Sequence, residues 1–338
     1  MEEKHDVQKT STLPRHLKTF VLIGAAGYVA PRHLKAIRET GGQLVAALDP
    51  HDAAGVLDAY FPETAFFTEF ERFDRHLEKL KKQGQAIDYL SVCSPNYLHD
   101  AHVRYGLRYG ADVICEKPLV LNPWNLEALR EMEQETGRRI WTILQLRHHP
   151  HIIALKKQVA DSDPDHLFDV ELTYITPRGN WYYTSWKGDE SKSGGIITNI
   201  GIHLFDMLLW VFGPLRQGDI HLRNHGRASG YLQLERARVR WFLSIEAATL
   251  PEAAAPHAAY RVLTLDGQAW TFSEGFGDLH TESYRALLDG RGCGLDAVLP
   301  AVQATHTLRN QKPVDRLDTY HPLAGLPLAK HPFAHEIN

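Results

Sequence analysis

The residues best suited to chemistry in this sequence are Lys117 and His203. Lys117 lies in the tripeptide Glu116-Lys117-Pro118, directly after the apolar stretch Asp112–Cys115, which is typical of a buried parallel strand. His203 follows a pair of glycines. A histidine, with an ordinary pKa of about 6.5, is suited to accept a proton, and a lysine ammonium is suited to stabilise developing negative charge. We therefore expect both residues to have a functional role.

A glycine-rich turn follows the first apolar stretch, Thr19–Ile23. Its first glycine allows a tight turn, its second lets the backbone approach a pyrophosphate, and an alanine stands where the third usually packs a helix on the strand. Asp49 ends the second apolar stretch, where a carboxylate would accept hydrogen bonds from a ribose diol and repel a 2′-phosphate. The alternative for Asp49 is a turn cap before Pro50. The pattern predicts an NAD site made by Gly24, Ala26, Gly27, Tyr28, Val29 and Asp49.

Two further loops are expected beside this turn. The apolar stretches Ile87–Cys93 and Asp112–Cys115 each lead directly into polar residues. Ligands bind at the carboxyl ends of the strands in open parallel sheets, so both loops should face one crevice.

The elements that must position these loops alternate in type. Apolar stretches typical of strands occur at Thr19–Ile23, Gln43–Leu48, Ile87–Cys93, Asp112–Cys115 and Arg139–Leu144, with amphipathic segments typical of helices between them. This order predicts a doubly wound α/β Rossmann domain at residues 19–146, after a polar leader at 1–18. Residues 147–338 are predicted to form an α+β domain on a mainly antiparallel sheet that binds substrate and oligomerises. Its expected strands alternate with period two and are Phe168–Thr176, Tyr231–Leu234, Val239–Ile245, Arg261–Leu265 and Gln268–Phe272, of which the last two are joined by a hairpin at Asp266-Gly267.

Composition excludes several classes of protein. The formal net charge is -4, which argues against nucleic-acid binding, and no apolar run reaches the roughly 20 residues of a membrane span. Three cysteines cannot form a disulfide framework, so we expect a cytoplasmic protein with reduced thiols. The histidine clusters lack the cysteine or carboxylate spacing of a zinc site, and no metal is predicted.

The motifs Gly24–Ala30 (GAAGYVA), Cys93–His99 (CSPNYLH) and Cys115–Pro118 (CEKP) resemble those of the Gfo/Idh/MocA oxidoreductases. The resemblance covers about residues 18–309 and implies a Rossmann domain joined to an open-faced antiparallel sheet. It implies that Lys117 is catalytic and that the NAD site is lined by Ser94, Pro95, Asn96, Leu98, His99, Glu116 and Lys117. In this family the position of Asn199 is commonly aspartate, so the proton must be handled by His203 and Lys117.

The second half contains the motifs Gln145–His149 (QLRHH), Arg178–Tyr182 (RGNWY), Ser185–Gly188 (SWKG) and Thr198–His203 (TNIGIH). These motifs are similar to those of one branch of that family, the bacterial UDP-N-acetyl-2-amino-2-deoxyglucuronate 3-dehydrogenases. The likeness implies NAD-dependent oxidation of the C3 hydroxyl of UDP-N-acetylglucosaminuronate. It further implies an aminotransferase as the next enzyme, a role in O-antigen or other lipopolysaccharide biosynthesis, NADH recycling by 2-oxoglutarate in some members, and a homotetramer.

Such a substrate carries a diphosphate and a carboxylate, which call for guanidinium and ammonium groups. The same motifs supply the candidates for substrate binding, namely Arg147, Arg178, Asn180, Trp181, Trp186, Lys187, Asn199 and His203. On a single helix, residues 199, 203 and 206 would share one face, with Asp206 in a structural role.

Other interpretations stay open at this point. The substrate could be a free sugar or polyol, as in inositol dehydrogenation, or the chain could be a non-catalytic NAD-sensing regulator. His203 could be a hydrogen-bonded core histidine, and the tryptophans could serve packing. Either His203 or Lys117 could take the proton, because burial beside NAD⁺ could lower the pKa of the lysine.

Overall fold

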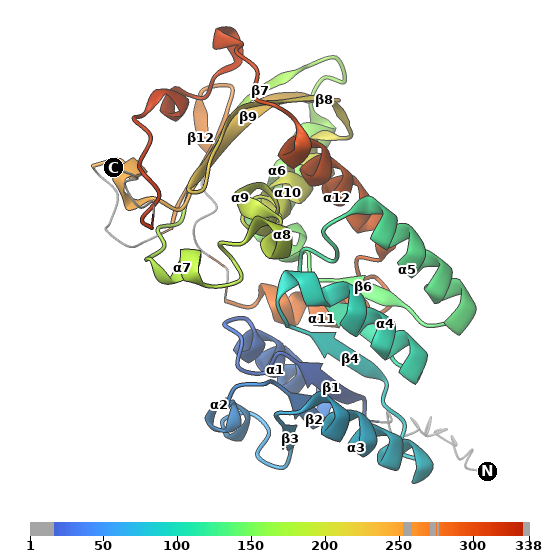
Figure 1. The fold of residues 1–338 in the computed structure, drawn as a ribbon. Coiled ribbons are helices and arrows are strands. Elements are labelled where there is room, and N and C mark those ends of the chain that lie inside the picture. Colours follow the sequence, from blue (N-terminus) through green and yellow to red (C-terminus); the bar gives the residue numbers. More distant parts are fainter. Residues whose placement is uncertain (1–16, 253–258, 271–274, 276, 334–338) are drawn as a thin grey trace, which may run out of the picture.

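The computed structural model describes residues 17–252, 259–270, 275 and 277–333. It contains two six-stranded sheets, one in each part of the chain (Figure 1). Most of the predicted leader, at 1–16, and the end of the strand predicted at Gln268–Phe272 lie outside the described residues.

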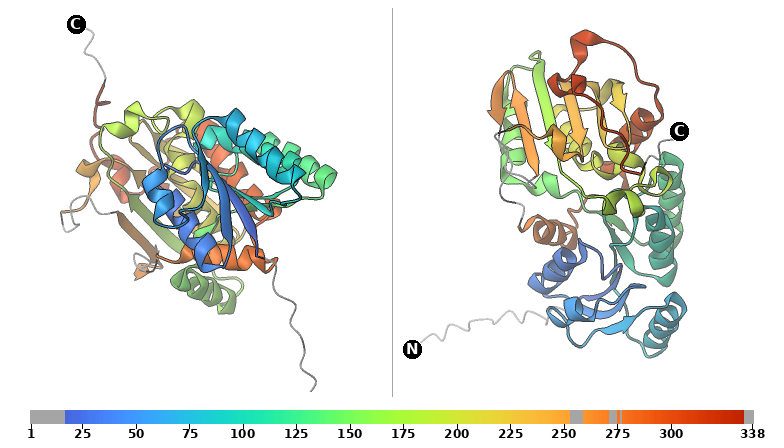
Figure 2. Two further views of the ribbon diagram at one scale, coloured as in Figure 1. Left: turned by 90° about the horizontal axis from the view of Figure 1, so that it is seen from below. Right: turned by 60° about the vertical axis from the view of Figure 1, so that its left-hand side comes forward.

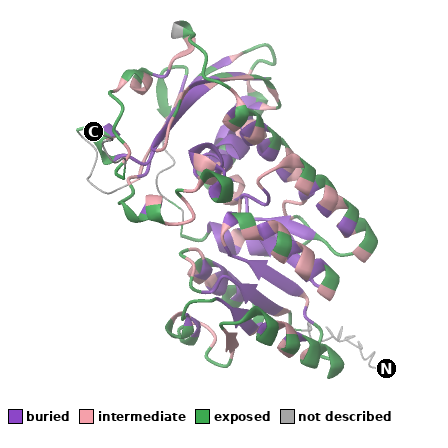
Figure 3. Cartoon of the chain, viewed as in Figure 1, coloured by how far each residue is buried: buried purple, intermediate pink, exposed green. Residues whose placement is uncertain are grey.

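The first sheet is entirely parallel, as predicted for a Rossmann domain. Its strand order is β3 (Ala65–Phe67), β2 (Gln43–Leu48), β1 (Thr19–Ile23), β4 (Tyr89–Val92), β5 (Asp112–Cys115) and β6 (Ile140–Thr142). The central strands are buried on both faces, which explains their unbroken apolar sequences (Figure 3). The helices of this part are α1 (Ala30–Glu39), α2 (Ala54–Asp58), α3 (Phe70–Lys82), α4 (His99–Tyr109) and α5 (Pro123–Thr136).

The second sheet is mixed and mainly antiparallel. Its order is β12 (Gln268–Trp270), β11 (Tyr260–Leu265), β7 (Phe168–Ile175), β10 (Ala237–Ser244), β9 (Arg227–Leu234) and β8 (Leu215–Arg223), and only β7 and β10 pair in parallel. Its core contains residues of α6 (Pro150–Asp161) and α10 (Ile202–Phe212). Three short helices connect β7 to α10: α7 (Trp181–Thr184), α8 (Glu190–Ser193) and α9 (Gly195–Asn199). Figure 2 shows the two parts in further views.

The contacts of the last two helices cross the sequence boundary between the two predicted domains. The helices α11 (Leu279–Leu288) and α12 (Leu295–Asn310) return to the Rossmann part after the second sheet. Tyr284 and Leu287 belong to the apolar core on one face of the first sheet, and Val298 and Val302 belong to the core on its other face. Thus α11 packs on the first part, and α12 lies between the two parts, in contact with α5 and β6 of the first and with α9, α10 and β8 of the second (Figure 1).

The segment after α12 covers part of the outer face of the second sheet. The backbone N–H of Val314 donates to the carbonyl of Ile220, and the buried His321 contacts Thr173 and stacks on Phe242. The sequence offered no prediction for this segment.

Among the described residues, no single helix is long and apolar enough to cross a membrane. Two helical segments that meet at a bend, Glu190–Asn199 and Ile202–Phe212, together have the length and composition of a membrane span. Much of the second segment is buried in the protein core.

Candidate active site

The glycine turn has the backbone that dinucleotide binding requires. Gly24 has a φ of 97°, and a Cβ there would lie 2.5 Å from the carbonyl carbon of Cys93. A Cβ at Gly27 would lie 3.1 Å from the carbonyl oxygen of Gly24. The turn leads into α1, whose N-terminus is the positive end of the helix dipole and has no side-chain cap. The residues present therefore fit a bound dinucleotide.

Asp49 closes this turn from the neighbouring strand. One carboxylate oxygen accepts from the N–H of Ala26 at 2.9 Å, and the other accepts from the N–H of His51 at 2.9 Å. The turn-capping contacts that were the alternative role for Asp49 are therefore present in the structure. A carboxylate has about four acceptor positions, so the ribose contact predicted for Asp49 remains available.

We expect Asp49→Ser to weaken NAD binding and narrow the preference for NAD over NADP, because it removes the charge that repels a 2′-phosphate. The ratio of kcat/KM for the two cofactors measures this. His51→Ala is the matched control, since it leaves the carboxylate in place. An unchanged ratio in Asp49→Ser would mean that the residue only shapes the turn.

Lys117 lies where the two parts of the chain meet. Its Nζ approaches the backbone carbonyl of Asn199 at 3.4 Å. Burial lowers the pKa of Lys117; Glu116 and Tyr174 raise it, and Arg178 and Arg32 lower it further. The ammonium is thus a stronger acid than a free lysine, which suits a donor to a developing alkoxide.

His203 presents an unused nitrogen. Its Nδ1 is buried and has no hydrogen-bond partner among the described residues, and its ring packs edge-on against Tyr174. Burial and the nearby charges of Lys117 and Arg261 hold the pKa of His203 well below its ordinary value. The imidazole is therefore neutral at physiological pH and free to accept a proton, which favours the catalytic interpretation over a hydrogen-bonded core histidine.

Asn199 and His203 do not share one helix. Asn199 ends α9, α10 begins at Ile202, and the segments Glu190–Asn199 and Ile202–Phe212 meet at a 41° bend. The side chain of Asn199 accepts from Asn96 at 3.2 Å and donates to the hydroxyl of Tyr182 at 3.1 Å. The prediction of a single helix is wrong, and the amide links the two parts of the chain.

Several predicted cofactor residues make hydrogen bonds within the protein. The ring nitrogens of the buried His99 lie 2.7 Å from the carbonyl of Pro118 and 2.8 Å from that of Ser94, so the ring joins the two loops rather than facing a ligand. The hydroxyl of Ser94 bonds to His102. Asn96 also donates to the carbonyl of Ser193. Pro95 and Leu98 lie on either side of Asn96 in one short turn. Tyr28 is largely exposed and lies next to Val29, just before α1.

The guanidinium of Arg147 is bound by a carboxylate of the protein itself. Its Nε and Nη2 donate to the carboxylate of Asp206 at 3.0 and 2.6 Å, and Nη2 also donates to the carbonyl of Ala297. The structure thus corrects the expectation that Arg147 binds substrate, because its charge is neutralised by a buried partner. This ion pair gives Asp206 the structural role that was expected of it.

Arg147→Ala should mainly destabilise the fold, by about 3–5 kcal/mol, since it leaves a buried carboxylate without its partner. Denaturant unfolding measures this loss. In the protein that still folds, KM for the substrate should change by no more than a factor of about two. A loss of about 1.4 kcal/mol in substrate binding would instead raise it about tenfold.

Three cations gather near the crevice. Burial lowers the pKa of Lys187, and Arg178 and Lys117 lower it further, so these three positive charges act on one another. The Nζ of Lys187 lies over the ring of Trp186 at 4.3 Å and that of Trp181 at 5.7 Å. Asn180 is exposed just before α7, as is the neighbouring Trp181. The cluster is suited to an anionic ligand.

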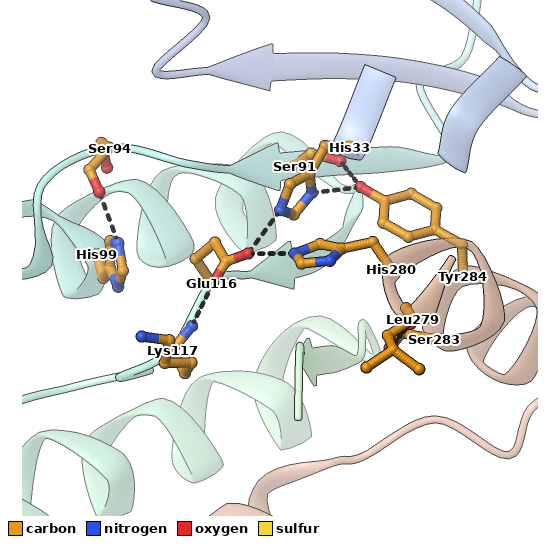
Figure 4. Close-up of polar contacts among 10 residues, drawn as sticks. All are labelled: His33, Ser91, Ser94, His99, Glu116, Lys117, Leu279, His280, Ser283 and Tyr284. Carbon is orange, nitrogen blue, oxygen red and sulfur yellow. Dashed lines mark hydrogen bonds and ion pairs between the residues drawn. The ribbon is translucent and has the colours of Figure 1, made fainter. Parts of the chain in front are cut away.

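The sequence analysis missed the surroundings of Glu116. This buried carboxylate accepts hydrogen bonds from His33 and His280 rather than facing the crevice (Figure 4). The three residues also have ligand atoms within 4.8 Å of one another, which is a spacing that a metal ion could use. His280 lies 164 positions from Glu116, so no local pattern indicates the cluster.

Comparison with known proteins agrees with this geometry. Residues 18–144 match the oxidoreductase family with an NAD-binding Rossmann fold (GFO_IDH_MocA), and residues 165–256 match its C-terminal alpha/beta domain. The chain is 28% identical to inositol 2-dehydrogenase from Rhizobium meliloti over 57% of its own length and 54% of that protein. It spans about half the length of the curated relatives it matches.

Solved structures are more similar. The WlbA (WbpB) dehydrogenase of Thermus thermophilus in complex with NAD and UDP-GlcNAcA is 48% identical, with a TM-score of 0.86, over 90% of this chain and 99% of that one. The same dehydrogenase with NAD and alpha-ketoglutarate is 49% identical, with a TM-score of 0.87 and the same coverage. This chain therefore belongs to the Gfo/Idh/MocA oxidoreductase family, and its first domain is the NAD-binding Rossmann domain of that family.

Proposed function

We propose that this protein oxidises the C3 hydroxyl of UDP-N-acetylglucosaminuronate to a ketone, with NAD as the oxidant. The observation that carries this proposal is the cluster of Lys117, Arg178 and Lys187 beside an unpartnered His203 nitrogen. Additional support comes from the dehydrogenase of 48% identity that is bound to NAD and UDP-GlcNAcA.

The oxidation removes a hydride from the sugar carbon and a proton from its hydroxyl. NAD⁺, when bound, supplies the hydride acceptor. His203, neutral and with a free Nδ1, takes the hydroxyl proton. The Lys117 ammonium donates to the same oxygen while it carries negative charge. The ketone, the reduced cofactor and the proton held on His203 together account for all atoms and electrons.

The charge of the substrate distinguishes the two enzyme interpretations. A nucleotide sugar acid brings a diphosphate and a carboxylate to the positive cluster, whereas inositol brings no anion. Three positive charges that act on one another are neutralised by an anion, so the cluster favours the nucleotide sugar. A non-catalytic NAD sensor has no need of Lys117 and His203 in this arrangement.

Arg178→Ala is expected to raise KM for the UDP-sugar by on the order of tenfold, because a hydrogen bond to a charged group contributes about 1.5–3 kcal/mol. The affinity for NAD should change little. Initial rates and isothermal titration measure the two effects. Arg147→Ala is the matched arginine control, since Asp206 occupies its guanidinium. Undiminished binding of the UDP-sugar to Arg178→Ala would remove this residue from the substrate site.

Thermal unfolding with single ligands tests the substrate class. We expect NAD and the UDP-sugar acid each to raise Tm, whereas myo-inositol should leave Tm unchanged. A shift with inositol and none with the UDP-sugar would favour the polyol alternative. A shift with NAD alone, together with no oxidation of either compound, would favour the regulator.

The biological setting belongs to the same proposal. We infer a cytoplasmic homotetramer that supplies its 3-keto product to an aminotransferase, in O-antigen or related lipopolysaccharide biosynthesis. We also propose that 2-oxoglutarate recycles the cofactor by accepting the hydride and becoming 2-hydroxyglutarate. As a dicarboxylate it suits the same positive cluster, and a similar dehydrogenase structure contains it with NAD.

A further inference from the structure

A buried hydrogen-bond network surrounds Glu116 (Figure 4). Its Oε1 lies 3.0 Å from Nε2 of His33 and 2.9 Å from Nε2 of His280. Its Oε2 accepts from the backbone N–H of Lys117 at 3.1 Å. The carboxylate of Glu116 is thus fixed by two imidazoles on one side and touches the backbone of the catalytic lysine on the other.

The network continues into the core through Tyr284. Its hydroxyl lies 2.8 Å from Nδ1 of His33 and 2.8 Å from the hydroxyl of Ser91. His33, Ser91, Glu116, His280 and Tyr284 are all buried. Tyr284 and His280 come from α11, His33 from α1 and Ser91 from β4, so the network ties α11 to the Rossmann sheet.

The hydrogen-bond pattern assigns the protons. If Ser91 donates to Tyr284 and Tyr284 donates to Nδ1 of His33, then Nε2 of His33 carries a proton and donates to Glu116. Nε2 of His280 donates to the same oxygen. Every contact is satisfied with two neutral imidazoles and one carboxylate anion, so the network carries one negative charge beside Lys117.

We propose that His33, His280 and Tyr284 are positioning residues of the active site: they hold Glu116 as an oriented anion, and Glu116 fixes the backbone of Lys117 and supplies the counter-charge that keeps its ammonium protonated. This inference rests on the proposed catalytic role of Lys117. It concerns residues that do not touch the substrate or the reacting atoms.

The electrostatics agree with the geometry. Burial opposes the charge on Glu116, but the hydrogen bonds from His280 and His33 hold its pKa well below the ordinary value. Glu116 in turn raises the pKa of Lys117 against the effect of burial. The charge of Glu116 also acts on other titratable groups, namely Cys93, Cys115, His99, His203 and Tyr284.

Loss of a donor has effects of known sign. Without the imidazole of His280, burial dominates and the pKa of Glu116 rises, so Glu116 binds a proton at a higher pH. The ammonium of Lys117 then loses its counter-charge and its pKa falls. The acid limb of kcat should therefore move up, by about one pH unit, because Glu116 is protonated at a higher pH than in the wild type. The charge of Glu116 raises the pKa of His203, so its loss cannot move a His203 limb upward.

The experiment compares four variants of the full chain. His280→Leu removes a donor, His280→Gln restores an amide donor, and Tyr284→Phe removes only a hydroxyl. Ser283→Ala is the matched control on α11, because its hydroxyl bonds only within the helix, to the carbonyl of Leu279. The measurements are kcat against pH, the Kd for NAD, Tm, and the metal content of the purified protein.

We expect a narrowed pH profile in His280→Leu and Tyr284→Phe, recovery of the profile in His280→Gln, and a native profile in Ser283→Ala, with the Kd for NAD unchanged throughout. A lowered Tm with a native pH profile in His280→Leu and Tyr284→Phe would overturn the proposal and leave the network a packing role. One bound metal ion per chain that disappears in His280→Leu would also overturn it, because the three ligand atoms would then hold a cation. If wild-type protein oxidises no UDP-sugar but binds NAD, the proposed function fails, and that result is distinct from a native pH profile in an active enzyme.

Discussion

Replacing Lys117 with alanine is expected to lower kcat by about 10³ or more, the upper range for removing a donor that stabilises a developing oxyanion. The ammonium of Lys117 donates to the alkoxide in the proposed mechanism, and its charge helps to lower the pKa of His203. Stopped-flow measurement of NADH formation checks the prediction. NAD should bind Lys117→Ala normally, because the glycine turn and Asp49 are untouched.

Lys192→Ala is the matched lysine control. Its ammonium lies on the short helix α8, where it pairs with Asp189, and its turnover should equal that of the wild type. A Lys117→Ala enzyme that retains more than about a tenth of the native kcat would contradict the assignment, because a donor to the alkoxide contributes far more than tenfold.

Replacing His203 with asparagine is expected to lower kcat by on the order of 10²–10⁴, the usual scale for general acid–base catalysis. Asparagine keeps a polar group of similar reach but cannot accept the proton. KM for the UDP-sugar should change much less than kcat, since the cationic groups that bind it remain in place.

The pH dependence of kcat in the wild type is a second test of the role proposed for His203. Its pKa is held well below 6.5 by burial and by positive neighbours, so the residue stays neutral and active as the pH falls through that value. The acid limb of kcat should therefore lie well below pH 6.5. An acid limb of kcat at the ordinary histidine value, or an unchanged acid limb in His203→Asn, would mean that a group other than His203 accepts the proton.

The sequence was sufficient for elements whose signals are local. The strands β1, β2 and β5 and the helix α4 have the predicted bounds, since each is a short apolar run or an amphipathic segment closed by a glycine or a proline. The positions of the glycine turn and of Lys117 were also predictable, because each follows directly on an apolar run that forms a strand.

Elements with weak local signals were missed. β3 has only three residues, and β8 reads LRQGDIHLR, where polar residues and Gly218 interrupt the alternation. The break between α9 and α10 arises at Gly201, where a Cβ would lie 2.5 Å from the carbonyl oxygen of Ile197 and 2.7 Å from Leu243 of β10. Tertiary packing, which periodicity does not report, sets that bend.

Long-range partners account for the remaining differences at the site. Arg147 pairs with Asp206 across 59 positions, and Tyr284 meets His33 across 251. A basic residue beside a site motif is suited equally to a substrate anion and to a buried carboxylate, and only the fold decides between them. The same holds for His99, whose two backbone acceptors lie on different loops.

The most direct test is a single incubation of the purified protein with NAD⁺ and UDP-N-acetylglucosaminuronate, with and without 2-oxoglutarate, followed by mass spectrometry. We predict a product lighter than the substrate by two hydrogens, with the new carbonyl at C3. We also predict that 2-oxoglutarate increases its yield and is itself converted to 2-hydroxyglutarate. Unchanged UDP-sugar in both incubations, with myo-inositol oxidised under the same conditions, would contradict the proposed function.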